Sequence, residues 1–280
     1  MKLFKNHHLL LLLATGIAFA QSSKTVTLTL GFKPATTYRQ TYIQNHKTTI
    51  KYKADEDVLK VLAEQGVQNP TVQEVKSDYT SELSTGKSLD GTTFPLTIKF
   101  IKAPDSFGKN GITSATKIYG HGEINTLPKI DSIVAPEMAD ALKKSVLKTL
   151  DGMFNQVKYP ERPFKRGDTQ QVVSPVTMPL AGTVLEMDLI TDYTLVEIKS
   201  GIARFDIGIS YKAKNNDPKY NITATGTGKG SMDYDIKKSF AVAQKSDILM
   251  QMAFTYKEFD MDIASEMHYD IKSAVLSDAK

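Results

Sequence analysis

The chain has 280 residues, of which 41% are hydrophobic and 24% are charged, and it contains no cysteine. This composition is typical of a globular protein, and it excludes a disordered chain and a fold held by disulfides. The formal net charge is +4; without Lys2 and Lys5, which belong to the leader described next, the 35 basic residues fall to 33 against 31 acidic ones. A charge balance this even predicts no nucleic-acid partner.

The first twenty residues have the pattern of a secretory signal peptide. Lys2 and Lys5 precede an apolar run over residues 9–17, and Ala18-Phe19-Ala20 places small residues where a signal peptidase reads them. We therefore expect cleavage before Gln21 and export to the periplasm or beyond. Gln21 stands where a lipoprotein needs cysteine, so we expect no lipid anchor. The apolar run is shorter than the ~20 residues that cross a bilayer, which predicts no integral membrane span after cleavage.

Alternation of apolar and polar residues with a period of two dominates the chain after the leader. It is clear in residues 26–32, 38–52 and 94–100, and it fills most of the second half of the sequence. Such alternation is typical of an antiparallel sheet that buries one face.

The parity of this alternation changes once near the C-terminus. Apolar residues occupy even positions from Ile248 to Tyr256 and odd positions from Phe259 to Ile271. A one-residue β-bulge within a single long strand would produce this change. A tight hairpin at Lys257 is the alternative, although the residues there are poor turn formers.

Two segments have helical periodicity instead. The first, Asp55 to Gln65, has acidic residues in its first turn, and Gly66 follows its end. The second, Pro136 to Val157, begins with a proline suited to the first helical position. We expect both amphipathic helices to pack on the sheet; a helix lying on a membrane surface is the alternative for the second. The apolar stripe of the second helix consists of Ala139, Leu142, Val146, Leu150, Phe154 and Val157.

A Pro-rich, basic segment divides the remaining chain. We predict a signal peptide (1–20), an N-terminal β-rich half with both helices (21–157), a linker (158–167) and a C-terminal antiparallel half (168–280). Asp78-Tyr79-Thr80 recurs as Asp192-Tyr193-Thr194, and each copy precedes a strand with Gly-x-Gly, which suggests a duplication. The predicted fold class is mainly β (α+β), with an antiparallel curved sheet or sheets in two similar halves that carry two helices.

Residues suited to catalysis or metal binding are scattered. His46, His121 and His268 follow the leader without metal-ligand spacing, and no Gly-x-Ser-x-Gly elbow is present. A row of acidic residues near the C-terminus could flank a substrate or hold calcium, but a solvated face balanced by cross-strand lysines explains it more simply. We therefore assign no catalytic residue, no metal ligand and no cofactor, and favour a role without catalysis. The acidic row consists of Glu258, Asp260, Asp262, Glu266 and Asp270.

Two sets of residues could instead line a binding site for an apolar ligand. One is a Met- and aromatic-rich face of a predicted strand, because methionine lines adaptable apolar pockets as well as filling cores. The other is a row of alternating glycines, which leaves one strand face without side chains and allows a helix, a bent neighbour or a ligand to approach closely. The predicted ligand-binding residues are Met250, Met252, Phe254 and Tyr256 in the first set and Gly226, Gly228 and Gly230 in the second.

Residues 165–240 resemble a family of uncharacterised secreted bacterial β-rich proteins, a domain of unknown function. The resemblance is carried by Gly167-Asp168, by the segment from Asp192 to Phe205, and by the glycine run before Tyr234. It implies export and a β-rich fold, and it supplies no catalytic residues. From the residues themselves we expect a binding or carrier protein for an apolar small molecule or lipid in the bacterial envelope. A protein–protein interaction module and a carboxylate-dependent hydrolase are the alternatives.

Overall fold

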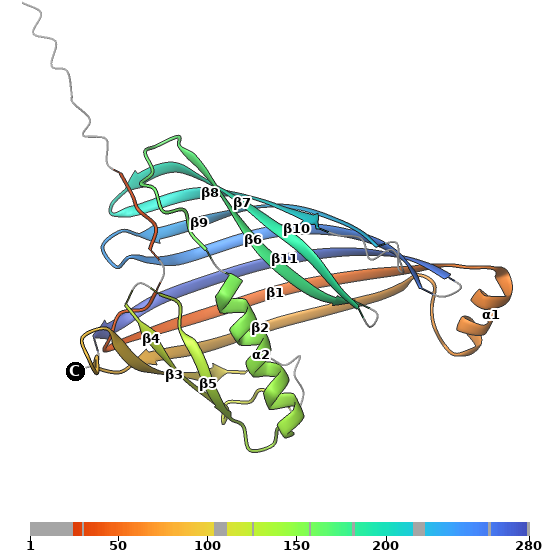
Figure 1. Ribbon diagram of the computed structural model, residues 1–280, viewed down its shortest axis with the longest axis horizontal. Coiled ribbons are helices and arrows are strands. Elements are labelled where there is room, and N and C mark those ends of the chain that lie inside the picture. Colours follow the sequence, from red (N-terminus) through yellow and green to blue (C-terminus); the bar gives the residue numbers. More distant parts are fainter. Residues whose placement is uncertain are drawn as a thin grey trace, which may run out of the picture.

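The computed structural model describes residues 25–29, 31–103, 111–124, 126–156, 158–180, 183–214, 222–256 and 259–278, and the predicted signal peptide lies outside them. Within these ranges, eleven antiparallel strands form a single sheet with two helices, which confirms the prediction of a mainly β protein (Figure 1). The strands are β1 (Thr36–Lys53), β2 (Thr71–Thr85), β3 (Thr93–Lys102), β4 (Lys117–Glu123), β5 (Lys129–Val134), β6 (Thr169–Leu180), β7 (Thr183–Lys199), β8 (Ile202–Ala213), β9 (Thr223–Asp235), β10 (Phe240–Tyr256) and β11 (Phe259–Asp278); the helices are α1 (Glu56–Glu64) and α2 (Asp140–Gln156).

The two halves of the chain share this sheet. The strand order is β5-β4-β3-β2-β1-β11-β10-β9-β8-β7-β6. Each strand therefore pairs with its neighbour in the chain, except that β5 and β6 form the two edges and α2 connects them. The halves join where β1 pairs with β11 over almost its whole length, from Thr36 opposite Asp278 to Lys53 opposite Asp260. The long strands of this central pair form the back of the molecule, and β6 and β7 curl in front of them (Figure 1).

The bulge predicted near Lys257 is wrong, because a hairpin is present there. The predicted single strand is two strands, β10 and β11, and Tyr256 pairs with Phe259 across the connection. When residue i pairs with residue i+3, even positions of one strand lie opposite odd positions of the next. The change of parity in the sequence therefore marks a two-residue connection between two strands, as in the hairpin alternative, and residues 257–258 themselves lie outside the described residues.

One face of the sheet, here called the inner face, carries the hydrophobic core. Side chains of even-numbered residues on β1, β9 and β10 point to this face, and so do those of odd-numbered residues on β8 and β11, as the register requires. The opposite side is called the outer face. Helix α2 covers the inner face at the β5 edge, where its Val146, Leu147 and Leu150 pack against Ile118 and Ile133.

The two helices differ in how they pack. Helix α2 lies on the sheet as predicted and begins later than expected, at Asp140; the side chains of Phe154 and Val157 lie outside the described residues. Helix α1 connects β1 and β2 at the far tip of the molecule, and none of its residues is buried (Figure 1). The expectation that α1 packs on the sheet therefore does not hold, because β1 and β2 carry it beyond the other strands.

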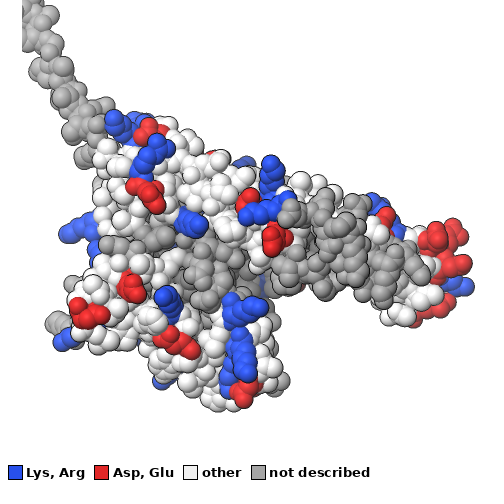
Figure 2. Space-filling model, in the orientation of Figure 1, with Lys and Arg blue, Asp and Glu red and all other residues white. Residues whose placement is uncertain are grey.

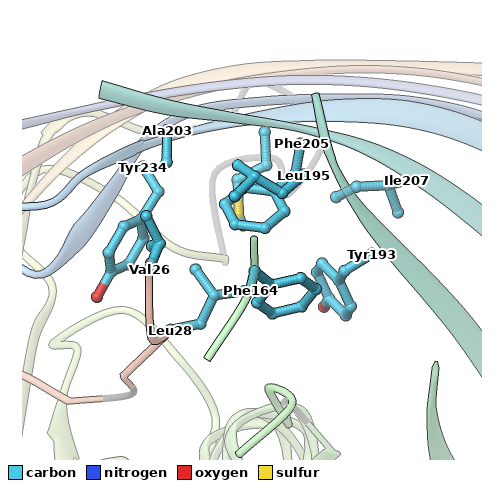
Figure 3. Packing of buried hydrophobic residues seen from close by; sticks show 10 residues of the cluster. Val26, Leu28, Phe164, Tyr193, Leu195, Ala203, Phe205, Ile207 and Tyr234 are labelled. Atoms are coloured by element: carbon cyan, nitrogen blue, oxygen red, sulfur yellow. The ribbon is translucent and has the colours of Figure 1, made fainter. Parts of the chain in front are cut away.

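The predicted linker is anchored to the core by Tyr159 and, most deeply, by Phe164. Phe164 is fully buried, exchanges two backbone hydrogen bonds with Val26, and packs edge-on against Phe205 with 5.1 Å between ring centroids. Figure 3 shows Val26, Leu28 and Phe164 lying under the inner face opposite Leu195 and Phe205. The predicted linker is therefore not a free connection. Burial of the apolar Phe164 within this Pro-rich, basic stretch holds residues 25–29 and 158–168 against the sheet.

Candidate ligand-binding face

The inner face is free of charge throughout the paired strands. No inner-face position of the eleven strands holds Lys, Arg, Asp or Glu; on β1 and β11 this holds from the Tyr38–Val275 pair to the other end of the two strands. The charged residues of these strands lie on the outer face, where cross-strand pairs such as Lys53–Asp262 and Lys245–Asp270 neutralise one another. In the space-filling view, charged side chains gather over α2 and at the acidic α1 tip (Figure 2).

The two ends of the inner face are filled, whereas its middle is only half-buried. One end is closed by the cluster around Phe164, and the other by the β6–β7 hairpin, whose Met187 joins a cluster with Met250 on β10. Between these clusters the inner-face side chains of several strands keep part of their surface accessible to solvent. These half-buried residues are Tyr42, Gln44, Tyr79, Phe100, Val172, Leu189, Thr191, Ile209, Tyr211, Gln244, Met267, Tyr269 and Ile271.

Tyrosines from four strands meet in this middle region. The ring of Tyr42 stacks on that of Tyr79, with centroids 4.8 Å apart, and lies 6.0 Å from that of Tyr269. Burial raises the pKa of Tyr79 to about 12, and it also raises the pKa of Tyr42, Tyr269 and Tyr211. The phenols therefore stay protonated and neutral at physiological pH, and each keeps an O–H donor.

Other neutral polar groups accompany the tyrosines. The Tyr42 hydroxyl donates to Gln44 Oε1 at 3.2 Å. His46 Nε2 lies 2.6 Å from the Ser265 hydroxyl and 3.0 Å from that of Thr48. These groups belong to β1 and β11, whereas the inner faces of β7 and β8 are mainly aliphatic. The half-buried region thus has one wall that can form hydrogen bonds and one that is apolar.

A pocket of about 200 Å³ opens on the inner face beside this region. Its polar lining includes Gln40, Gln244 and Ser273, and its apolar lining includes Phe240 and Ile271. The Gln40 amide donates weakly to Ser273, at 3.4 Å, and the Gln244 amide makes no hydrogen bond to the described residues. The remaining lining residues are Thr29, Gly31, Phe32, Leu127, Tyr159, Ala241 and Ala243.

The residues predicted to bind ligand all lie in β9 and β10. Met250, Met252 and Phe254 point to the inner face and are buried in the cluster that closes one end of it. They border the half-buried region through Tyr211 and Met267, which pack against this cluster. The side chain of Tyr256 lies outside the described residues.

The predicted glycine row permits a close approach of the neighbouring strand. A Cβ atom on Gly228 would lie 2.7 Å from the carbonyl oxygen of Asp247, and one on Gly226 would lie 2.9 Å from the Tyr211 ring. At Gly230 the backbone of Lys245 would obstruct a Cβ atom even more. The glycines therefore let β10 bend tightly against β9, which helps the sheet to curl around its inner face.

The described members of the acidic row near the C-terminus lie on the outer face, and Glu258 lies outside the described residues. Asp262 pairs with Lys53, Asp270 with Lys245, and Asp260 accepts a hydrogen bond from Thr255. Asp262 borders an outer-face hollow of about 360 Å³, and it is the only carboxylate among the described residues that line it. This arrangement provides ion pairs on a solvated face and no second carboxylate for acid–base chemistry there.

The histidines are dispersed in the same way. His121 bonds Asp131 at 2.9 Å on the outer face of β4 and β5, and His268 bonds Asp247 at 2.7 Å on that of β10 and β11, whereas His46 faces inward. Across the described ranges, no group of three or more His, Asp or Glu side chains could hold a metal ion.

Sequence reasoning missed the residues that make the half-buried region distinctive. Its four tyrosines lie far apart in the chain: Tyr42, Tyr79, Tyr211 and Tyr269. Gln244 lies near the bulge at Ala241–Ala243, which shifts the parity of β10. A signal for them was present: the apolar parities of β6, β8, β9, β10 and β11 lack charges and carry Tyr, Gln or Ser instead, whereas that of β7 lacks charges only as far as the bulge after Leu195.

Comparison with known proteins gives no family for this chain. No helix among the described residues is long and apolar enough to cross a bilayer. No family model matches the sequence, and the search of curated proteins found no similar one.

Proposed function

We propose that the protein is an exported carrier that binds an apolar small molecule or lipid on the half-buried part of its inner face. One observation carries this proposal: the inner face is uncharged from the Tyr38–Val275 pair onward, packed at both ends and half-buried between them. Partly accessible Tyr42, Tyr79, Ile209 and Leu189 leave apolar surface that a ligand would cover. The signal-peptide pattern of residues 1–20 supports export.

The size of the inner pocket indicates how a ligand would lie. Its volume of about 200 Å³ is below the ~300–1,000 Å³ of a typical small-molecule site. The pocket would therefore hold one end of a ligand, and the remainder would extend along the half-buried face toward Tyr42 and Tyr269.

Binding of N-phenyl-1-naphthylamine, a neutral apolar dye whose fluorescence rises on leaving water, tests the proposal. Ser273→Phe places a ring in the pocket, and Ala274→Phe places the same ring on the outer face of the same strand, where residue 274 is exposed. We expect dye binding to wild type and to Ala274→Phe, and a loss of at least about ten-fold in affinity for Ser273→Phe. Equal dye binding by both variants, with circular dichroism showing that both are folded, would contradict the inner face as the site.

A second candidate is a protein-interaction surface on the outer face. Leu249 is 59% exposed in an outer-face hollow of about 360 Å³, beside Lys47, Glu266 and the His268–Asp247 pair. An exposed apolar side chain within a charged rim is typical of interaction sites. Charge reversal at Asp260 and Asp262 should weaken capture of a partner from the host envelope if the adjoining acidic row takes part, and it should leave dye binding unchanged.

A further inference from the structure

The chemistry of the inner face narrows the ligand class, provided that the proposed carrier function holds. A buried ionised carboxylate or phosphate needs a cation or several hydrogen-bond donors, since removing the charge from water is otherwise very costly. The strands place no Lys or Arg on the inner face from the Tyr38–Val275 pair onward. A headgroup with an ionised acid would therefore lack a counter-ion wherever it lay along these strands.

Neutral hydrogen-bonding groups are nevertheless concentrated around the pocket. The Gln244 amide, which has no partner among the described residues, can both donate to a ligand oxygen and accept from a ligand hydroxyl. Gln40 and Ser273, which form only a weak mutual hydrogen bond, lie on the adjoining strands. A purely aliphatic ligand would leave the Gln244 amide without a partner, at a cost of about 1–3 kcal/mol if it were also shielded from water.

We infer that the ligand is an uncharged lipid with a hydroxyl, ester or ketone oxygen, and that this oxygen bonds Gln244 while the hydrocarbon lies along β7 and β8. The apolar wall that receives the chain is formed by Leu189 and Ile209, and the tyrosines of β1 and β11 supply further O–H donors opposite it. Free fatty acids and anionic phospholipids should bind more weakly, because no cation on these strands would neutralise their charge, and so should hydrocarbons without a polar group.

Three ligands of equal chain length separate these possibilities: 1-dodecanol, dodecanoate and dodecane, each displacing the naphthylamine dye at about pH 8, well above the pKa of a carboxylic acid. We expect dodecanol to displace the dye at the lowest concentration. Dodecane should be about five- to ten-fold weaker, which corresponds to one hydrogen bond, and dodecanoate at least about ten-fold weaker.

Variants at one position assign the preference to Gln244. Gln244→Leu should bring dodecanol down to the level of dodecane. Gln244→Lys should reverse the order of dodecanol and dodecanoate by supplying the missing cation. Gln251→Lys is the matched control, because Gln251 lies on the same strand but is exposed on the outer face, and it should preserve the wild-type order.

The outcomes distinguish the two proposals. If dodecanoate binds wild type as well as dodecanol, or dodecane does, the neutral-headgroup inference is wrong while the carrier function stands. If the order of the three ligands is as expected but Gln244→Leu leaves it unchanged, Gln244 is not the polar contact and the inference fails at that residue. If neither the dye nor any of the three ligands binds, the carrier function itself is refuted.

Discussion

Gly228 provides the sharpest test of why the sheet curls. The structure leaves no room for a side chain there, since a Cβ atom would lie 2.7 Å from the carbonyl oxygen of Asp247 and 3.0 Å from Ile248 Cγ1. Because one of these contacts is with backbone, Gly228→Ala must push β10 away from β9. Overpacking of this kind costs about 1–3 kcal/mol. Alanine recovers about 0.5–1 kcal/mol by restricting the unfolded chain, so we expect a net loss of up to about 2.5 kcal/mol.

Gly208 on β8 is the matched control. A Cβ atom there would meet only Asp192, at 3.6 Å, which is an ordinary contact. Gly208→Ala should therefore stabilise the protein by about 0.5–1 kcal/mol, through the unfolded chain alone. Urea denaturation of both variants measures the difference as opposite shifts of the midpoint at an unchanged slope. If Gly228→Ala were as stable as Gly208→Ala, close strand approach would not be the reason for glycine in β9.

Three further predictions concern the core and the outer face. Burial raises the pKa of Tyr193 from 10.0 to about 12. A raised folded-state pKa means that stability is lost as pH rises above about 10, by about 2 kcal/mol at pH 12, and Tyr193→Phe should remove that share of the loss. Phe164→Ala should lower the free energy of unfolding by about 3–5 kcal/mol. It should also speed proteolysis near Val26, because the segment around Val26 packs against the Phe164 ring. Asp262→Ala should change stability by less than about 1 kcal/mol, since its partner Lys53 is half exposed.

Three measurements check these predictions. Denaturation between about pH 8 and 12 tests Tyr193→Phe, limited proteolysis with mass mapping tests Phe164→Ala, and the urea midpoint tests Asp262→Ala. An unaltered alkaline slope in Tyr193→Phe would show that the phenol is solvated in the folded protein. Proteolysis of Phe164→Ala at the wild-type rate would show that Phe164 does not hold the N-terminal segment. A loss of several kcal/mol in Asp262→Ala would mean that this outer-face pair is shielded from water, contrary to the exposure of both side chains.

The alternation of apolar and polar residues predicts, for most strand positions, which side chains face the core and which face water. The side-chain period of a strand is two, so the face of each residue follows from its parity without knowledge of any partner. Met252 and Phe254 are buried as their parity predicted, and the acidic row around Asp262 faces outward with lysines across from it. The absence of charges from the inner face was visible in the same pattern for β8, β9 and β11, whereas in β3, β5 and β7 it depends on register shifts that parity does not reveal.

The identity of neighbouring strands and the accessible part of the inner face depend on contacts across the assembled sheet. The pairing of β1 with β11 brings Tyr42 beside Tyr269 across more than two hundred residues of sequence, and no local pattern specifies such a pairing. Strands β10 and β11 pair along their length although the two residues between them, Lys257 and Glu258, are poor turn formers in the sequence. Parity is a property of adjacent residues, whereas curvature and accessibility arise from contacts between distant strands, so the candidate site became visible only when the sheet had been assembled.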